Sequence, residues 1–286
     1  MNKAAHSPPW AIEIIYYTDP YCTWCWGSEP ILRRLEVVFG EQLKLSYKMG
    51  GLVEDIDEFY DPTNDISSME QVAPHWLDAS TRHGMPVDIT VFDKYSDEIR
   101  STYPSGIAYK AAEIVDKDLA VKYLRRLREA AALCLPIHRR ETQLELAKEI
   151  GLDVDAFTGA LGDGRAEAAF LADVDEARLS GISSFPTFIV RNERGEQIAL
   201  RGYQSFDSFA GVIDSVHGTP LERREPPPLE EILSSYGRLA TQEAAEIYGV
   251  TREQAAEGLD MLVKAGKAVK VPAGTGEFWD LLDDAK

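Results

Sequence analysis

The sequence predicts an α/β fold with two strand-bearing halves, a long helical stretch between them and a small C-terminal α+β module. Strand patterns lie within residues 11–58 and again within 181–218, whereas residues 59–180 have helical periodicity without strand signals. A run of three prolines at 226–228 then precedes short helical patterns and a β-like tail.

Size and charge narrow the class of protein. The 286 residues are 44% hydrophobic and 27% charged, which is typical of a globular chain with a proper core. The 30 basic and 48 acidic residues give a net charge of −18, which argues against nucleic acid as a partner because phosphates attract a basic surface. The start of the chain lacks the apolar core of a signal peptide, and no apolar run is long enough to span a bilayer. We therefore expect a cytoplasmic protein without membrane contacts, in a compartment that keeps thiols reduced.

The first half is predicted as strand, helix and strand. Residues 11–17 mix β-branched and aromatic side chains over a short stretch, as buried strands do. From about residue 22 to 39 apolar residues recur at helical spacing, and Gly40 is a natural stop. The alternation of residues 42–49 predicts a second strand.

The helical middle gives way to a second strand-bearing half. Amphipathic helices are predicted in the middle at 118–133, 142–150 and 154–161. Strand patterns then return on both sides of a Gly-containing turn, at 186–192 and 196–203, and predict a β-hairpin. A last amphipathic helix follows at 206–216.

The C-terminal part begins with the clearest linker of the sequence, the Pro-rich residues 222–231. Within the module at 229–286, helical patterns lie at 229–236, 241–248 and 251–265. The last two helices and the β-like tail have the outline of a winged helix. Because Glu253, Glu257 and Asp260 on the last helix would repel phosphates, we expect this module to serve protein contacts or packing rather than DNA.

The motif CTWC at 22–25 follows a strand and opens a helix. A structural zinc ion needs four ligands, but Cys134 is the only further cysteine and the five histidines are not at ligand spacing. Haem attachment needs a histidine directly after the second cysteine, where this chain has Trp26. A redox dithiol suits the position best, so we expect no metal and no cofactor. Two unrelated buried cysteines are the plain structural alternative.

A thiol at a helix N-terminus is chemically special, because the helix dipole and unpaired N–H groups stabilise its thiolate. Cys22 is therefore expected to have a lowered pKa and to attack a substrate disulfide, while Cys25 resolves the mixed disulfide. Trp24 and Trp26 form an apolar lip for peptide substrates or belong to the core. Cys134 lies in an apolar helical run and is expected to be a small buried hydrophobe.

Two segments together resemble a known family. DPYCTWCW at 19–26 and GISSFPTF at 181–188 are similar to the DsbA family of thioredoxin-fold proteins, in its cytosolic FrnE-like and YjbH-like branch. The resemblance implies a thioredoxin fold with a large all-helical insertion at 59–180. It also implies that Pro186 is a cis-proline facing the dithiol, beside backbone that can pair with an extended substrate. Phe185, bulkier than the residues common at its position, then belongs to the substrate-binding surface.

The motif and the resemblance lead to one main functional prediction and two alternatives. We predict a thiol–disulfide oxidoreductase or isomerase that acts on protein or peptide disulfides through the dithiol. YjbH-like relatives act as adaptors that deliver a regulator to the ClpXP protease, and the C-terminal module would suit such a protein partner. A kappa-class glutathione transferase is a weaker alternative, because those relatives usually have serine at the first cysteine position.

Overall fold

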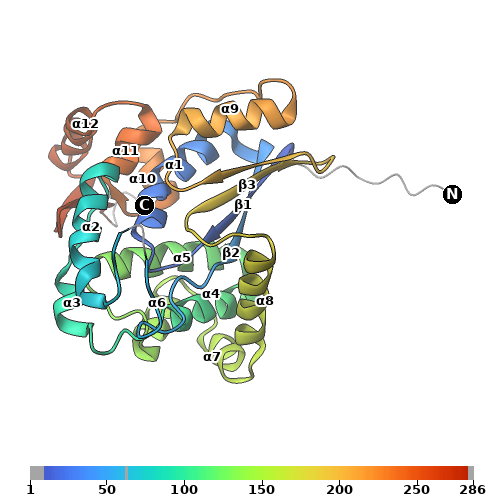
Figure 1. Cartoon of the computed structure of the whole chain (residues 1–286). Coiled ribbons are helices and arrows are strands. Elements are labelled where there is room, and N and C mark those ends of the chain that lie inside the picture. Colours follow the sequence, from blue (N-terminus) through green and yellow to red (C-terminus); the bar gives the residue numbers. More distant parts are fainter. Residues whose placement is uncertain (1–9, 62–63, 283–286) are drawn as a thin grey trace.

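The computed structural model describes residues 10–61 and 64–282, and its centre is a four-stranded mixed β-sheet (Figure 1). The strands are β1 (Ile12–Thr18), β2 (Leu43–Met49), β3 (Thr187–Asn192) and β4 (Gln197–Arg201). Their order in the sheet is β2-β1-β3-β4. β2 runs parallel to β1, whereas β3 runs antiparallel to both of its neighbours. Each of these strands lies where the sequence predicts one.

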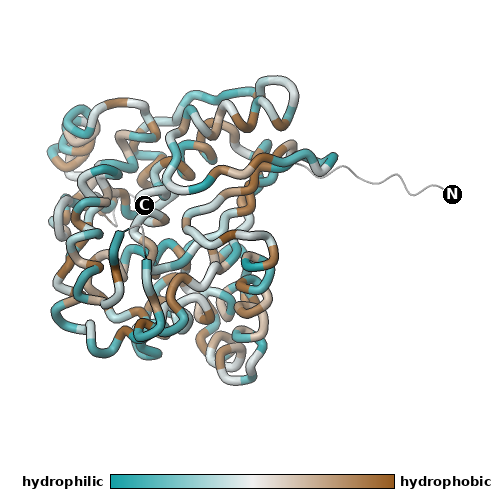
Figure 2. The backbone as a smooth tube through the Cα atoms, in the orientation of Figure 1, coloured by the Kyte–Doolittle hydropathy of each residue, from teal (hydrophilic) through white to brown (hydrophobic). Residues whose placement is uncertain are grey.

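Side chains alternate between the two faces of this sheet along each strand, and the buried ones on one face form a core. Ile14 and Tyr16 of β1 are fully buried there and pack in one cluster with Phe188 of β3. The rings of Tyr16 and Phe188 are stacked with centroids 4.4 Å apart, because the two residues are paired across neighbouring strands. Figure 2 shows the hydrophobic segments along these strands. Cys22 and Cys25 belong to the same cluster.

Two helices cover that face, α1 (Thr23–Phe39) and α9 (Phe206–His217) (Figure 1). α1 begins directly after Cys22, whose sulfur caps it, and ends at Gly40, where φ is +55°. Glycine adopts this positive φ without the steric cost that a Cβ would bring. α9 begins after Ser205, whose hydroxyl accepts the backbone N–H of Ser208. Both helices match the sequence prediction.

The described residues between β2 and β3 form an all-helical insertion. Its helices are α2 (Met69–His83), α3 (Thr90–Tyr95), α4 (Tyr103–Val115), α5 (Lys117–Ala132), α6 (Arg140–Glu149), α7 (Val154–Gly162) and α8 (Arg165–Leu179). α4 to α8 lie below the sheet in Figure 1, on the side opposite α9. The insertion has its own core, in which Tyr109, Leu127 and Phe157 are buried. The predicted helical insertion is therefore confirmed.

The C-terminal part is a small α+β module. It contains α10 (Leu229–Tyr236), β5 (Leu239–Ala240), α11 (Thr241–Tyr248), α12 (Arg252–Lys264), β6 (Ala268–Ala273) and β7 (Gly276–Leu281). The three strands form a separate antiparallel sheet in the order β5-β7-β6. α11 packs along α1, and the module lies beside α2 in Figure 1. The predicted fold class, a thioredoxin fold with a helical insertion and this module, is confirmed.

The Pro-rich segment before the module is held against the body of the protein. The backbone N–H of Arg224 donates to the carbonyl of Val38 at 2.8 Å. The side chain of Gln42 exchanges two hydrogen bonds with the backbone of Glu222, at 2.8 and 3.2 Å. Residues 222–228 contain no helix or strand, but these contacts tie them to the end of α1. The division of the chain into domains stays a prediction.

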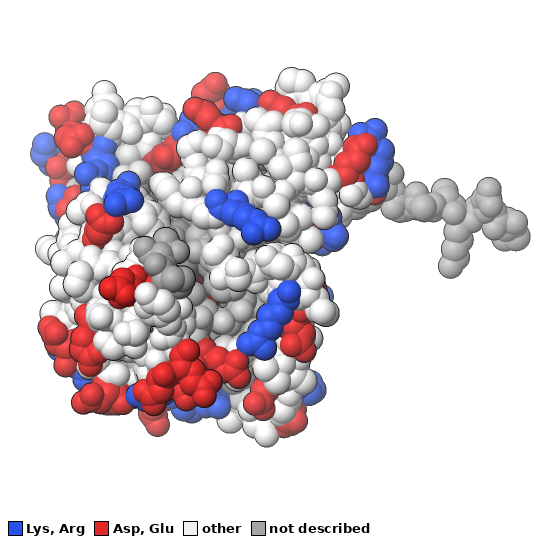
Figure 3. Space-filling view, in the orientation of Figure 1, with Lys and Arg blue, Asp and Glu red and all other residues white. Residues whose placement is uncertain are grey.

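Charged side chains lie mainly at the periphery of the face shown in Figure 3, with acidic ones gathered over the lower half that the insertion forms. Most of the centre of this face is formed by residues other than Lys, Arg, Asp and Glu, with basic side chains among them. In the described part of the chain, no helix combines the length and the apolar character needed to cross a membrane. Residues 1–9, on which the expected lack of a signal peptide rests, lie outside the described residues.

Candidate active site

The two cysteines of the CTWC motif lie at the N-terminus of α1 in unequal surroundings. The sulfur of Cys22 accepts the backbone N–H of Cys25 at 3.2 Å, and so takes the capping position of the helix. Both cysteines are reduced thiols. The Cys22 residue retains 6% exposure, whereas Cys25 is completely buried. Of the two cysteines, only Cys22 therefore keeps any contact with solvent.

The loop that precedes β3 lies against this dithiol. The peptide bond between Phe185 and Pro186 is cis, as the resemblance implied. The thiol of Cys22 donates to the carbonyl oxygen of Phe185 at 3.5 Å. On the other side, the carbonyl of Pro186 accepts the backbone N–H of Gly202 at 2.8 Å. The start of α1 at Cys22, the loop at Phe185 and Pro186, and Gly202 are far apart in the sequence but lie close together at this site.

Phe185 finds room at this position because Gly50 has no side chain. A Cβ atom on Gly50 would lie 2.0 Å from two carbons of the Phe185 ring, which no real contact allows. Phe185 is only partly buried, so its ring rests on Gly50 at the rim of the site. The Gly50-Gly51 pair was visible in the sequence, but its partner could not be predicted from it.

The two tryptophans of the motif have different places. Trp24 is half-buried, and its ring centroid lies 5.9 Å from those of both His83 and Tyr203. Trp26 is 2% exposed, and its indole N–H donates to the carbonyl of Pro86 at 2.9 Å. Trp24 therefore lies at the rim of the dithiol, whereas Trp26 belongs to the core, where it packs near Phe278 of β7.

A buried arginine lies beneath the dithiol. Arg128 of α5 is 1% exposed and donates hydrogen bonds to the hydroxyl of Thr18 and to the carboxylate of Glu29. Its guanidinium lies 5.1 Å from the centroid of the Tyr16 ring. The hydroxyl of Tyr16 in turn donates to the carbonyl of Cys25 at 3.3 Å. Its one signal in the sequence was a charge on the apolar face of an amphipathic helix.

The pKa values of the two thiols move in opposite directions. Burial alone raises the pKa of Cys25, but the hydrogen bond with Cys22 and the positive charge of Arg128 outweigh it, and the net pKa lies below the usual value. Burial raises the pKa of Cys22 well above the usual value, and the hydrogen bond between the Cys22 and Cys25 side chains raises it further. Of the two thiols, Cys25 is therefore the one that gives up its proton more readily. The expected lowered pKa of Cys22 is therefore wrong for this reduced site, because one capping N–H does not offset burial and the hydrogen bond with Cys25.

Comparison with known proteins agrees with this architecture. A family model described as thioredoxin matches residues 16–210, which include the dithiol, the insertion and the loop at Pro186. The chain belongs to this thioredoxin family. The DsbA-like resemblance in the sequence is confirmed for this thioredoxin-family protein at the level of its fold.

Curated relatives extend over nearly the whole chain. The ClpXP adapter protein SpxH of Halalkalibacterium halodurans is 29% identical over 275 residues, which are 95% of this chain and 89% of that protein. The protein of the same name from Bacillus subtilis is 26% identical over 278 residues, or 96% of this chain and 91% of that protein. The similarity to both therefore includes the C-terminal module.

A solved structure resembles the thioredoxin-family part. The cytosolic disulfide reductase DsbM from Pseudomonas aeruginosa superposes with a TM-score of 0.54 and 25% sequence identity. The match covers 72% of this chain and 95% of that chain. More than a quarter of this thioredoxin-family protein thus has no counterpart in that reductase.

The third cysteine lies apart from the dithiol contacts. Cys134 follows α5, is 8% exposed and belongs to the core of the insertion, as predicted. Its sulfur accepts hydrogen bonds from Thr90 at 3.1 Å and Lys94 at 3.5 Å. Within the described residues, no group of three or more acidic, histidine or cysteine side chains is arranged to hold a metal ion.

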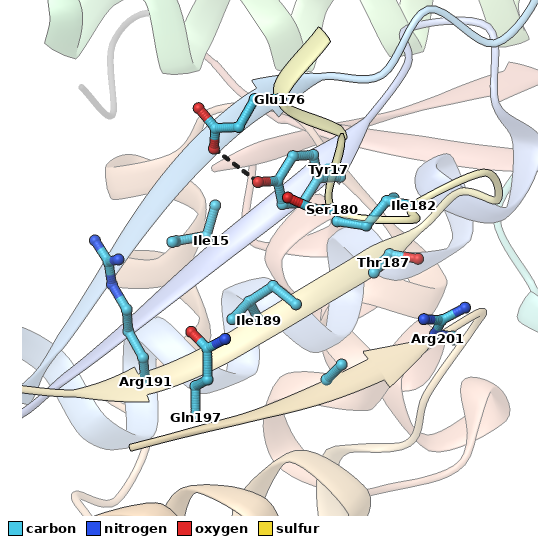
Figure 4. Close-up of a pocket in the computed structure, with 11 residues that line it drawn as sticks. Ile15, Tyr17, Glu176, Ser180, Ile182, Thr187, Ile189, Arg191, Gln197 and Arg201 are labelled. Atoms are coloured by element: carbon cyan, nitrogen blue, oxygen red, sulfur yellow. Dashed lines mark hydrogen bonds between the residues drawn. The ribbon is translucent and has the colours of Figure 1, made fainter. Parts of the chain in front are cut away.

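A separate groove of about 330 Å³ lies on the other face of the sheet (Figure 4). Ile15 and Ile189 form its floor, and Arg191 and Arg201 lie at its borders. The hydroxyl of Tyr17 donates to Glu176 at 2.8 Å along one side. No residue predicted for the site from the sequence lines this groove, so it is distinct from the dithiol.

Proposed function

We propose that this thioredoxin-family protein is a thiol–disulfide oxidoreductase of protein or peptide disulfides in the reducing cytoplasm. The observation that carries this proposal is the asymmetry of the dithiol. Cys22 keeps 6% exposure and its sulfur lies 3.5 Å from the carbonyl of Phe185, while Cys25 is completely buried. Such a pair can form a mixed disulfide through one sulfur and resolve it through the other.

Each step of the exchange moves one proton as well as one sulfur–sulfur bond. Cys22 attacks one sulfur of the substrate disulfide as a thiolate, the substrate S–S bond breaks, and the first substrate sulfur leaves and takes up the proton that Cys22 gave up. Cys25 then attacks the Cys22 sulfur as a thiolate. The second substrate sulfur leaves and takes up the proton of Cys25, and a Cys22–Cys25 disulfide remains. A thiol reductant returns the pair to the dithiol form.

The proposed substrate surface consists of the residues around Cys22. Phe185 and Pro186 offer backbone on one side, and Trp24 offers an aromatic face on the other.

Insulin reduction by the full chain, with a thiol reductant in excess, tests the proposal. Wild type is compared with Cys22→Ser and with Cys134→Ser, which removes a buried thiol outside the dithiol. We expect Cys22→Ser to lose the activity over background and Cys134→Ser to keep it. Equal rates for wild type and Cys22→Ser would rule out the enzymatic proposal.

A second candidate function is delivery of a protein to the ClpXP protease. It is supported by the two curated adapter relatives, whose similarity covers 95% and 96% of this chain, whereas that to DsbM covers 72%. An adapter acts by binding, so this function would not need the thiol of Cys22. Deleting the C-terminal module is a poor test of this function. Trp26 of α1 packs near Phe278 of that module, so the deletion would also disturb the helix that carries the dithiol.

The adapter function is therefore tested with the full chain. A partner that co-purifies with wild type is added to purified ClpXP, and its degradation is followed with and without the protein. Cys22→Ser should accelerate degradation as well as wild type does if the protein is an adapter. Loss of the acceleration in Cys22→Ser would show that the partner is held through thiol exchange instead.

A further inference from the structure

The cation beneath the dithiol comes from another part of the chain. Arg128 is carried by α5 of the insertion, whereas Thr18 and Cys25 belong to β1 and α1. The guanidinium is 1% exposed, and one of its N–H groups donates to Thr18 on the strand that leads to the dithiol. The insertion therefore places a full positive charge inside the thioredoxin-fold core.

This charge is only partly neutralised. Glu29 accepts one N–H group of Arg128, and Thr18 accepts another. The remaining Nε–H of Arg128 is buried and has no hydrogen-bond partner among the described residues. An arginine with an unused donor in a closed site can stabilise a further anion nearby.

The groups that face Cys25 leave few sources of such stabilisation. The hydroxyl of Tyr16 donates to the carbonyl of Cys25 at 3.3 Å, and the Arg128 guanidinium lies 5.1 Å from the centroid of that Tyr16 ring. The hydroxyl of Thr18, which accepts from Arg128, also lowers the pKa of Cys25, whereas Asp19 raises that of Cys22. On the α5 side the facing charge is that of Arg128, which is opposed by Glu29. A negative sulfur at Cys25 is thus favoured by the arginine and disfavoured by both carboxylates.

We propose that Arg128 is a positioning residue that stabilises the thiolate of Cys25, so that Cys25 can attack the mixed disulfide between Cys22 and the substrate. In that step the bond between the two protein sulfurs forms as the Cys22–substrate bond breaks. The electron pair leaves with the substrate thiolate, and Arg128 keeps its proton throughout. Glu29 opposes the effect by sharing the same guanidinium. This inference rests on the proposed thiol–disulfide exchange and names the group that drives its second step.

The test reads the Cys25 thiol directly and needs no turnover. In the full chain, Cys22→Ser together with Cys134→Ser leaves Cys25 as the single cysteine. The ultraviolet absorbance of its thiolate is followed during a pH titration, and circular dichroism confirms folding of each variant. The chain with these two serines is compared with the same chain that also carries Arg128→Met or Glu29→Gln.

Opposite shifts are expected from the two members of the buried pair. Arg128→Met should raise the titration midpoint of Cys25 by about 1–3 pH units, because an opposite charge at this range lowers a pKa by that amount. Glu29→Gln should lower the midpoint, because it leaves the arginine without its carboxylate. A purely structural role would not give shifts of opposite sign.

Two further variants secure the interpretation. Arg126→Met makes the same substitution on α5 at a more exposed arginine, which pairs with Glu149 at 3.0 Å, and should leave the midpoint unchanged. If Arg128→Met does not fold, the double variant Glu29→Gln with Arg128→Met removes both buried charges, and its midpoint should still lie above that of the parent.

Shifts of the same sign in the two single variants, or an unchanged midpoint in folded Arg128→Met or in the double variant, would overturn the inference. Failure of insulin reduction with the expected titration shifts would overturn the proposed enzyme and leave the electrostatic role of Arg128 standing. Normal insulin reduction without the titration shifts of Cys25 would overturn the role of Arg128 and leave the proposed enzyme standing.

Discussion

Arg33 of α1 and Glu243 of α11 form an ion pair 2.9 Å long that is almost closed to solvent, with side-chain exposures of 7% and 0%. Glu243 also accepts a hydrogen bond from Arg125 of α5 at 3.1 Å and caps α11 by accepting the N–H of Ala240 at 2.7 Å. One carboxylate therefore joins the helix that carries the dithiol, the insertion and the C-terminal module.

Removal of this carboxylate should destabilise the whole protein. Glu243→Gln leaves two arginines poorly compensated in the interior, so we expect a loss of about 3–5 kcal/mol in the free energy of unfolding. Glu246→Gln is the matched control on the same helix, because its pair with Arg34 is partly exposed and should contribute about 0–1 kcal/mol. Urea denaturation measures both. Equal losses in the two variants would contradict the central role of Glu243.

The two tryptophans of the motif should separate substrate binding from stability. Trp24→Ala is expected to raise the KM for insulin several-fold with little change in unfolding, because its ring lies at the rim. Trp26→Ala removes a buried ring and its bond to Pro86, and should cost about 3–5 kcal/mol in stability. Steady-state kinetics and urea denaturation distinguish them. A stability loss in Trp24→Ala as large as that in Trp26→Ala would place both in the core.

The close approach of Gly50 to Phe185 leads to a third prediction. Gly50→Ala should displace the Phe185 ring, reduce insulin reduction and cost about 1–3 kcal/mol, because its Cβ would overlap the ring. Adding Phe185→Ala should recover most of the stability. Gly211→Ala, within α9 and in open space, is the control and should raise stability by about 0.5–1 kcal/mol. Thermal unfolding measures all of them, and an unchanged Gly50→Ala would refute the contact.

His83 predicts how stability depends on pH. Burial lowers the pKa of His83 from 6.5 to about 4, so the folded protein keeps this ring neutral while the unfolded chain protonates it. The free energy of unfolding is therefore unaffected by His83 above pH 6.5. It decreases as the pH falls towards 4, by up to about 3 kcal/mol, because only the unfolded chain takes up the proton. His83→Asn, whose amide oxygen can accept the N–H of Met85, should flatten this part of the profile.

His217→Asn, at the end of α9, is the control for that profile and should leave its slope unchanged. Urea denaturation between pH 4 and 7 provides the measurement. A slope that persists in His83→Asn would assign the pH dependence to other groups.

Sequence patterns predicted the regular elements well, because the signals are local. The C-terminal helices were predicted within a residue or two, since Gly249 ends α11 and Thr251 caps α12 with Gln254. The strands were visible as β-branched and aromatic runs. The packing of the Pro-rich segment along α1 was not predictable, because its hydrogen bonds to Val38 and Gln42 join residues distant in the chain.

The site was only partly predictable for the same reason. Cys22 and Cys25 stood out through their spacing at a helix start, and Pro186 through resemblance. Arg128, Gly50 and His83 became relevant only where the insertion and the strand ends meet. An arginine between Leu124 and Ala131 on the apolar face of α5 was a signal of a buried charge, but not of its partner.

By itself the sequence determined the dithiol, the order of the elements and the class of fold, because periodicity, capping residues and a short motif act over a few residues. The tertiary structure decided which of the two thiols gives up its proton more readily. It did so by burying Cys22 against Phe185 and by bringing Arg128 beneath Cys25, since electrostatic free energy depends on distances and burial across the whole fold.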